Sequence, residues 1–214
     1  TMRGAFIVIE GLDRSGKSTQ TALLAARLAA HGRPVEQFKF PDRTTPIGQM
    51  IDAYLRSQSD LEDHAIHLLF SANRWELAPR IESLLASGTT VLSDRYAPSG
   101  LSFSASKGLP LPWCAAPDVG LPAPDLVIFL DIDPSKAAER GGYGKERYER
   151  REVQERVRGV FRLLGDGEGE DRWKVVDAGQ EMDQVTREIW EAVEPLRVGV
   201  EGEVKRLWVD RKWE

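Results

Sequence analysis

The chain has 214 residues, of which 41% are hydrophobic and 29% charged, and its formal net charge is −5 at pH 7. This composition is ordinary for a globular protein, and the length fits one domain, residues 1–214, with its own core. The negative charge argues against a broad nucleic-acid surface, and no apolar stretch approaches membrane-spanning length, so we expect neither partner.

The first half of the chain alternates apolar runs with amphipathic segments, the pattern of strands followed by helices. His31-Gly32 and Ser87-Gly88 are typical helix ends, and Pro41 stops a strand. In chain order the pattern predicts a strand, a helix, a strand, two helices and a strand: Ala5–Ile9, Thr19–Ala30, Val35–Phe40, Pro46 to about Arg56, a long helix from an N-cap within Ser59–Glu62 to Ala86, and Thr89–Leu92.

The second half continues the alternation. Leu126–Leu130 is a continuous apolar run, typical of a strand buried on both faces. Asp133-Pro134 then supplies an N-cap and a first-turn proline for a helix, which a run of glycines interrupts. Three more elements follow: the helix Glu146–Leu164, the strand Trp173–Val176 and the helix Glu181–Val193. The whole pattern predicts an α/β fold with a parallel five-stranded sheet flanked by helices on both faces.

A phosphate-binding sequence lies between the first strand and the first helix. Gly11-Leu12-Asp13-Arg14-Ser15-Gly16-Lys17-Ser18 fits G-x-x-x-x-G-K-[ST], the P-loop, in the strand–loop–helix context that the motif needs. Its glycines let the backbone wrap a phosphate, and the helix N-terminus adds a positive dipole end. We expect the loop to bind the phosphates of a nucleotide, with Ser18 also holding Mg²⁺, through Gly11, Ser15, Gly16, Lys17, Ser18 and Thr19.

The loop alone does not separate kinases, ATPases and GTPases. Guanine-specific GTPases normally carry N-K-x-D, but the only asparagine, Asn73, is followed by Arg74. A D-x-x-G string at Asp166–Gly169 lies in a polar stretch after a helix, and we interpret it as a connection. Arg14, inside the P-loop, can reach a transferring phosphoryl group and compensate its charge, unless it is simply a solvated loop side chain.

Four further segments form a specific combination with this loop: Phe40-Pro41-Asp42-Arg43, Leu68–Glu76, Asp94-Arg95-Tyr96 and Pro117–Pro122. With Asp13-Arg14 in the P-loop, the combination resembles the thymidylate kinase family, in particular its eukaryotic type, and the resemblance reaches from the first strand to about Ala178. It implies a P-loop fold and transfer of the ATP γ-phosphoryl group to dTMP, giving dTDP and ADP in dTTP synthesis. It also implies Mg²⁺ and a homodimer.

A nucleoside monophosphate acceptor needs an aromatic face for its base and cations for its phosphate. Phe70 and Arg74 are four positions apart on the long helix and share a face, so Phe70 is expected to stack on the base while Arg74 binds an oxygen. Phe70 continuing the apolar stripe of Leu68-Leu69 into the core is the alternative. Arg43 follows the second strand at its carboxyl end, where ligands collect, and suits a phosphate.

The resemblance adds further acceptor contacts. It implies that Asp13 accepts a hydrogen bond from the 3′-OH, that Arg95 binds phosphate and that Ser99 lies near the base edge. Phe103 is expected to shape the pocket, although a plain core position is an equal alternative. The complete set expected to bind dTMP is Asp13, Phe40, Arg43, Phe70, Arg74, Arg95, Ser99, Phe103 and Tyr148.

The catalytic groups are expected at the point where the two substrates meet. Arg14, Lys17 and Arg95 would compensate the charge of the transferring group. Asp94 ends the third strand and is the expected acid near Mg²⁺, directly or through water. Asp131, which ends the strand Leu126–Leu130, is a rival by pattern alone. The resemblance favours Asp94, because the arginine beside it is a phosphate ligand in that family.

The segment from about residue 140 to 151 is rich in glycine and arginine and is predicted to form a lid over ATP. By resemblance, Arg140 stacks on adenine, Ala178 lies beside adenine through backbone contacts, and Glu149 lies near the metal. Family members with a P-loop arginine usually lack a catalytic lid arginine, yet this chain also has Arg150-Arg151. We assign catalysis to Arg14 and leave the lid pair open.

Two rival functions remain. A deoxynucleoside kinase would use a carboxylate base beside a 5′-hydroxyl, and Glu10 is the candidate, but Arg43 and Arg74 favour an acceptor that is already phosphorylated. A nucleotide-binding regulatory protein would bind ATP without turnover. The single cysteine, Cys114, suits a reducing compartment, and we expect the cytoplasm, with the nucleus as an additional location.

Overall fold

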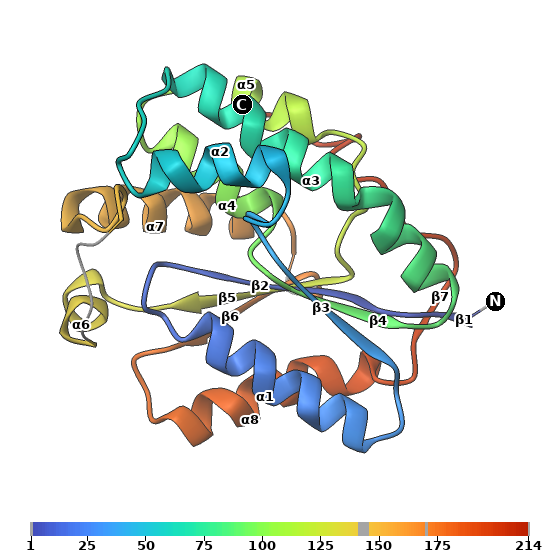
Figure 1. Cartoon of the computed structure of the whole chain (residues 1–214). Coiled ribbons are helices and arrows are strands. Elements are labelled where there is room, and N and C mark those ends of the chain that lie inside the picture. The colour runs from blue at the N-terminus through green and yellow to red at the C-terminus, as the bar shows by residue number, and fades with distance from the viewer. Residues whose placement is uncertain (1, 141–145, 170, 214) are drawn as a thin grey trace.

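A five-stranded parallel sheet forms the centre of the molecule in the computed structural model, which describes residues 2–140, 146–169 and 171–213. The strand order is β3-β4-β2-β5-β6, which confirms the predicted parallel sheet (Figure 1). The strands are β2 Phe6–Gly11, β3 Val35–Lys39, β4 Thr90–Asp94, β5 Leu126–Asp131 and β6 Trp173–Asp177.

Helices cover both faces of the sheet (Figure 1). One face carries α1 and α8, and the other carries the remaining long helices, with α2 packed on α3 and α4 packed on α7. The helices are α1 Lys17–Ala30, α2 Pro46–Leu55, α3 Asp63–Ala86, α4 Ala97–Ala105, α5 Leu111–Ala115, α6 Pro134–Glu139, α7 Arg151–Asp166 and α8 Met182–Val193, with 3₁₀ turns η1 Ala116–Asp118 and η2 Glu194–Leu196.

The register of the strands brings distant segments to one edge of the sheet. Asp94, at the end of β4, is paired with Ile9 on one side and with Lys39 on the other. Gly11, at the end of β2, is paired with Leu130 of β5. The P-loop, the end of β3 and the end of β4 therefore meet at the carboxyl edge, where open α/β sheets bind their ligands.

Continuous apolar runs explain the central strands. Every residue of β2 is buried, and so are the first five residues of β5, as expected for strands covered on both faces. Phe129 of β5 stacks on Phe161 of α7 with ring centroids 4.9 Å apart, which holds α7 against the sheet. A smaller cluster around Ile51 and Ile66 packs α2 on α3 beside the carboxyl edge.

Helix α4 was not predicted, because its sequence contains proline, glycine and serines, all poor helix formers. The helix forms because almost every residue is buried and because a buried carboxylate satisfies its first turn. Glu10 accepts hydrogen bonds from the backbone N–H groups of Tyr96 at 2.9 Å and Ser99 at 3.0 Å. Tertiary contacts thus override local propensity here.

One predicted helix start was wrong and another was confirmed. The helix expected from Glu146 begins at Arg151, because the residues before it dock on α2, with the Arg147 N–H donating to the Leu55 carbonyl at 2.9 Å. The long helix α3 is capped by Glu62, which lies within the predicted stretch Ser59–Glu62. The interrupting glycines, Gly141, Gly142 and Gly144, lie outside the described residues.

The C-terminal tail is tied to the rest of the chain. Its strand β7, Val200–Glu201, pairs antiparallel with β1, Met2–Arg3, and Leu207 exchanges backbone contacts with Leu121 and Gly120. Trp208 is buried. Among the described residues, no helix has both the length and the apolarity that crossing a membrane would need.

Candidate active site

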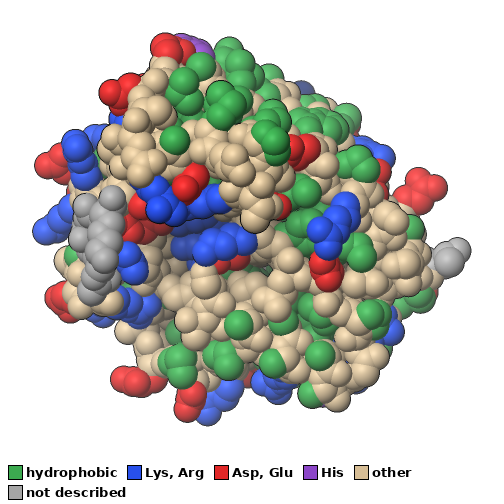
Figure 2. Space-filling view, in the orientation of Figure 1, with side chains coloured by type: hydrophobic (Ala, Val, Ile, Leu, Met, Phe, Trp, Pro, Cys, Tyr) green, Lys and Arg blue, Asp and Glu red, His purple; other side chains and the backbone are tan. Residues whose placement is uncertain are grey.

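The carboxyl edge of the sheet is hollowed by a cavity of about 630 Å³. It is lined by the P-loop, the end of β3, one face of α3, the start of α4 and the segment before α7. Figure 2 shows Lys and Arg side chains gathered at this hollow. Every residue predicted for the site lines the cavity except Gly11, which lies at the start of the loop.

Two residues of the P-loop adopt a left-handed backbone conformation. Gly16 has φ 96° and Arg14 has φ 65°, in the left-handed region that costs a side-chain-bearing residue free energy. Lys17 Nζ donates to the Leu12 carbonyl at 2.6 Å. Burial, and after it the neighbouring charge of Arg95, lowers the pKa of Lys17 to about 7. A phosphate bound in the loop would restore the charged form.

Ser18 and Asp94 form a pair at the mouth of the loop. The Ser18 hydroxyl donates to Asp94 Oδ2 at 2.5 Å, and Lys39 Nζ lies 3.7 Å from the same oxygen. A hydroxyl and a carboxylate are the oxygen ligands that Mg²⁺ prefers, and a site beside substrate phosphates needs only one or two of them. The donor set therefore fits Mg²⁺.

Asp131, the alternative to Asp94 as the acid near Mg²⁺, is instead paired with two arginines of α7. Arg158 of α7 binds both of its carboxylate oxygens, at 2.6 and 3.1 Å, and Arg162 adds a third contact at 2.8 Å. Although burial works in the other direction, these hydrogen bonds hold the pKa of Asp131 below its usual value. Asp131 is not among the described residues that line the cavity, so the geometry favours Asp94.

Arg95 joins the P-loop to the start of α4. Its guanidinium forms an ion pair with Asp13 and donates to the Gly11 carbonyl at 2.9 Å and to the Ser99 hydroxyl at 3.0 Å. Asp13 also accepts a hydrogen bond from Gln154 Nε2 of α7 at 2.8 Å, while its own N–H donates to Gln154 Oε1 at 3.0 Å. These contacts fix both predicted residues at the centre of the cavity.

Two arginines lie at the acceptor end of the cavity, each oriented by carboxylates. Arg43 donates to Asp52 at 2.6 Å and to Glu146 at 2.8 and 3.2 Å. Arg74 makes a two-point contact with the fully buried Asp118, at 3.0 and 2.6 Å. Both arginines line the cavity, and a guanidinium suits a phosphate, so the geometry is consistent with the predicted acceptor site.

Aromatic rings form the walls of the acceptor end. Phe70 is only partly buried and faces the cavity, in contrast to its alternative as a core residue. Phe103 is 9% exposed, carries the Arg95 guanidinium over its ring and packs on Tyr148 at a centroid distance of 5.2 Å. Phe40 is buried but also reaches the cavity. A flat base between these rings would be largely shielded from water.

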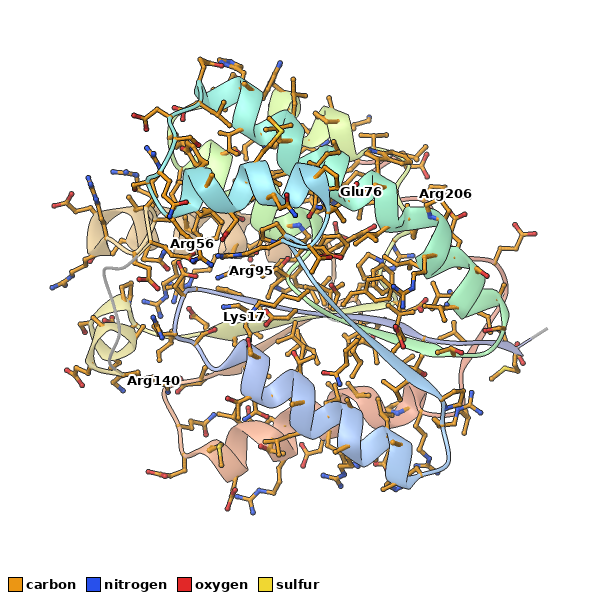
Figure 3. All side chains as sticks on the ribbon, viewed as in Figure 1. Lys17, Arg56, Glu76, Arg95, Arg140 and Arg206 are labelled. Carbon is orange, nitrogen blue, oxygen red and sulfur yellow. The ribbon has the colours of Figure 1, made fainter. Side chains whose placement is uncertain are left out.

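The end of the cavity that is predicted to hold ATP, the phosphoryl donor, is bounded by Arg140, which lies beside the P-loop (Figure 3). Its guanidinium donates to the carbonyls of Arg14 at 3.1 Å and Ala178 at 2.6 Å. Glu149 lies 3.4 Å from the Arg14 guanidinium. Of the described arginines near the lid, Arg150 and Arg151 do not line the cavity, and Arg151 pairs with Glu155 on α7. The geometry thus favours Arg14 over the lid pair.

Glu10, the base required by a deoxynucleoside kinase, is unsuited to that role. It is fully buried, its carboxylate accepts from the Ser99 hydroxyl at 2.5 Å and caps α4, and it is absent from the cavity lining. Burial raises its pKa, and no acceptor hydroxyl can reach it. Glu10 therefore cannot act as the base that this mechanism needs.

Several residues that shape the site were not predicted. Gln154 lies in an ordinary helical pattern and gives no signal in the sequence. Asp118 lies within Pro117–Pro122, a segment used only for the resemblance, and its pairing with Arg74 depends on the tertiary fold. Lys39 and Asn73 likewise depend on which loop packs against which helix. A contact between residues this far apart in sequence cannot be predicted from local patterns.

A P-loop that opens into a cavity with cationic and aromatic walls defines a P-loop kinase acting on a phosphorylated nucleoside. Comparisons with known proteins give the family. The family model described as thymidylate kinase matches residues 9–189. Thymidylate kinase of Arabidopsis thaliana is 54% identical over 89% of this chain and 71% of its own, and that of Homo sapiens is 46% identical over 96% and 98%.

A solved structure of thymidylate kinase from Candida albicans superposes with a TM-score of 0.88 at 38% identity, covering 96% of this chain and 99% of that one. This chain belongs to the thymidylate kinase family. Its reaction is phosphorylation of dTMP by ATP in dTTP synthesis.

The pKa of Lys17 gives a test of the ligand-free site. Because the phosphates of ATP favour the charged amine, ATP binding should raise this pKa from about 7, so that binding takes up a proton in weakly alkaline solution. ATP affinity should then fall as the pH rises above about 7. Calorimetry at about pH 8 in two buffers of different ionisation heat measures the uptake, and equal heats in both would contradict it.

Proposed function

We propose that both substrates bind in the one cavity, with ATP on the P-loop and dTMP at the end lined by Arg43, Phe70 and Arg74. The observation that carries this proposal is the continuity of the cavity from the loop to these residues. Arg140 and Ala178 would flank adenine, and Tyr148 and Ser99 would complete the dTMP pocket. This arrangement directs the acceptor phosphate toward the P-loop, as transfer requires.

Transfer needs positioning and charge compensation more than proton chemistry. An oxygen of the dTMP phosphate would attack the γ-phosphorus, and the bond from that phosphorus to the β–γ bridging oxygen would break, leaving ADP. The nucleophile needs no base, because a phosphate monoester has a second pKa of about 6. Arg14, Lys17 and Arg95 would stabilise the charge on the transferring group.

We propose that Ser18 and Asp94, the second directly or through water, would hold Mg²⁺, which when bound neutralises charge on the phosphate oxygens. The 2.5 Å hydrogen bond between the two side chains supports this pairing. Glu149 is a further candidate, although its carboxylate lies against Arg14. Titration of the ligand-free protein with Mn²⁺ should show weaker binding in Asp94→Asn; unchanged binding would count against the assignment.

The exposed face of α3 supports a homodimer, which we propose. Leu68 and Trp75 are seven positions apart on one face, with 48% and 41% of their surface exposed. Trp75 Nε1 donates to the Pro117 carbonyl, and Val119, two residues further on, is 39% exposed. Figure 2 shows hydrophobic side chains over the side of the molecule where α3 lies in Figure 1. Sedimentation should give a dimer that Trp75→Glu dissociates; a monomeric wild type would refute this.

The chain is proposed to act as one domain whose lid is the segment of about 140–151, of which 141–145 lie outside the described residues. At one end of this segment, Arg140 contacts the P-loop carbonyl of Arg14. Toward the other end, Arg147 donates to the Tyr54 carbonyl of α2 at 3.0 Å. A segment tied to both the donor and the acceptor side is suited to shield the reaction from water.

The catalytic role of Arg14 can be tested against the lid arginines. Arg14→Ala should lower kcat about 10³-fold, the scale of a catalytic arginine, with a modest effect on the KM for dTMP. The matched control is the double variant Arg150→Ala/Arg151→Ala, which should retain most of its kcat. A nearly normal kcat in Arg14→Ala together with an inactive double variant would reverse the assignment.

The role of Phe70 is tested by comparing the two substrates. Phe70→Ala removes the ring expected to stack on thymine, so the KM for dTMP should rise by at least about tenfold while the KM for ATP changes little. Steady-state kinetics with each substrate varied in turn measure both constants. Equal losses for dTMP and ATP would mean that Phe70 acts through the fold.

A further inference from the structure

Asn73, the only asparagine of the chain, is fully buried and is not among the residues that line the cavity. Its side chain instead forms two hydrogen bonds with the peptide backbone of Asp42, an arrangement that we call the clasp. Asn73 Oδ1 accepts a hydrogen bond from the Asp42 N–H at 2.7 Å, and Nδ2 donates to the Asp42 carbonyl at 3.2 Å. The backbone N–H and the backbone carbonyl of Asp42, the residue just before Arg43, are therefore both held by the side-chain amide of Asn73.

The same amide is fixed from two other directions. Nδ2 also contacts Glu76 Oε1 at 2.6 Å and the Thr45 hydroxyl at 3.1 Å, and the Thr45 hydroxyl donates to Glu76 at 2.7 Å. Figure 3 shows Glu76 on α3 beside the start of α2. Thr45 accepts from the Gly48 N–H at 3.0 Å and so caps α2. One amide thus ties α3 to both the loop and the next helix.

The loop is also in close contact with α2. Gly48 of α2 lies so close to the loop that a Cβ there would overlap the carbonyl oxygen of Asp42. Asp42 is thereby confined between Gly48 on one side and Asn73 on the other. The backbone leading into Arg43 is consequently contacted by both α2 and α3.

Arg43 extends from this fixed point into the acceptor end of the cavity. Its side chain is 33% exposed, and its guanidinium is held by Asp52 and Glu146. The next residue after Asn73 is Arg74, which lines the same cavity and is oriented by Asp118. Two consecutive residues of α3 thus act on the acceptor end. Asn73 holds the loop that carries Arg43, and Arg74 is itself the second arginine.

We propose that Asn73 is a positioning residue for Arg43, and that it sets the affinity of the site for the phosphate of dTMP. The inference rests on the proposed role of Arg43 as a phosphate ligand. Only an amide offers an acceptor and two donors in one plane, as this clasp requires. A displacement of about 1 Å can cost roughly 10²-fold in activity, so the anchor of a phosphate-binding arginine matters functionally.

The test separates phosphate recognition from general stability by comparing dTMP with thymidine, which lacks the phosphate. In Asn73→Asp the carboxylate keeps the acceptor but loses both donors and faces Glu76, so the loop should shift. Calorimetry should show roughly tenfold weaker dTMP binding, while thymidine binding changes by less than about twofold. Glu82→Gln, which removes a carboxylate from the far part of α3, is the matched control and should change neither.

The Arg43→Ala background distinguishes failure of this inference from failure of the proposed function. Arg43→Ala should itself weaken dTMP but not thymidine, and adding Asn73→Asp should cause no further loss of dTMP affinity. If Arg43→Ala weakens both ligands equally, the phosphate role of Arg43 is refuted and the inference with it. If Arg43→Ala behaves as expected but Asn73→Asp weakens both ligands equally, or still weakens dTMP in that background, only the inference is refuted.

Glu76→Gln provides a milder second variant, in case Asn73→Asp fails to fold. It keeps the side-chain shape but replaces a carboxylate acceptor of the Asn73 amide by a neutral one. A smaller loss of dTMP affinity with unchanged thymidine affinity is expected, and a parallel loss of both would overturn the proposal. Thermal melts followed by circular dichroism establish that each variant is folded.

Discussion

The ion pair between Arg95 and Asp13 joins parts of the chain that are far apart in sequence. Arg95 follows β4, Asp13 belongs to the P-loop, Ser99 of α4 accepts from the same guanidinium, and Gln154 brings α7 to the same carboxylate. The P-loop, the acceptor pocket and the helix after the lid segment are therefore fixed relative to one point. The roles proposed for Arg14 and Lys17 depend on that arrangement, because both lie in the loop that the pair anchors.

The balance of charge in the cavity explains why its acceptor carries a phosphate. The carboxylates there are already engaged by protein groups, since Asp118 holds Arg74 and both Asp52 and Glu146 hold Arg43. Lys17 is so strongly desolvated that its pKa is lowered to about 7. Bound phosphates would supply negative charge that favours the charged form of Lys17 and would exchange with the carboxylates at the two arginines. A neutral hydroxyl acceptor would supply none, and Glu10 is too deeply buried to activate one.

The fold was largely predictable because continuous apolar runs mark strands buried on both faces, as in β2 and β5, and because the P-loop fixes its own strand–loop–helix context. Helix α4 was not predictable, because its stability comes from burial and from the carboxylate of Glu10 rather than from its own sequence. The P-loop residues, Arg43, Phe70 and Arg74 were predicted from motif and spacing and the others from the resemblance, and all of them except Gly11 line the cavity. Their partners, such as Gln154, Asp118 and Asn73, were missed because pairing across the fold leaves no local pattern.

The central claim is that this cavity transfers a phosphoryl group from ATP to a nucleoside that is already phosphorylated. The most direct measurement is ADP release in a coupled assay with Mg²⁺ and ATP, comparing dTMP, thymidine and a panel of other nucleoside monophosphates. The account predicts turnover that depends on dTMP, with none above background for thymidine. Turnover with thymidine at a rate similar to that with dTMP, or ATP hydrolysis that ignores the acceptor, would contradict it.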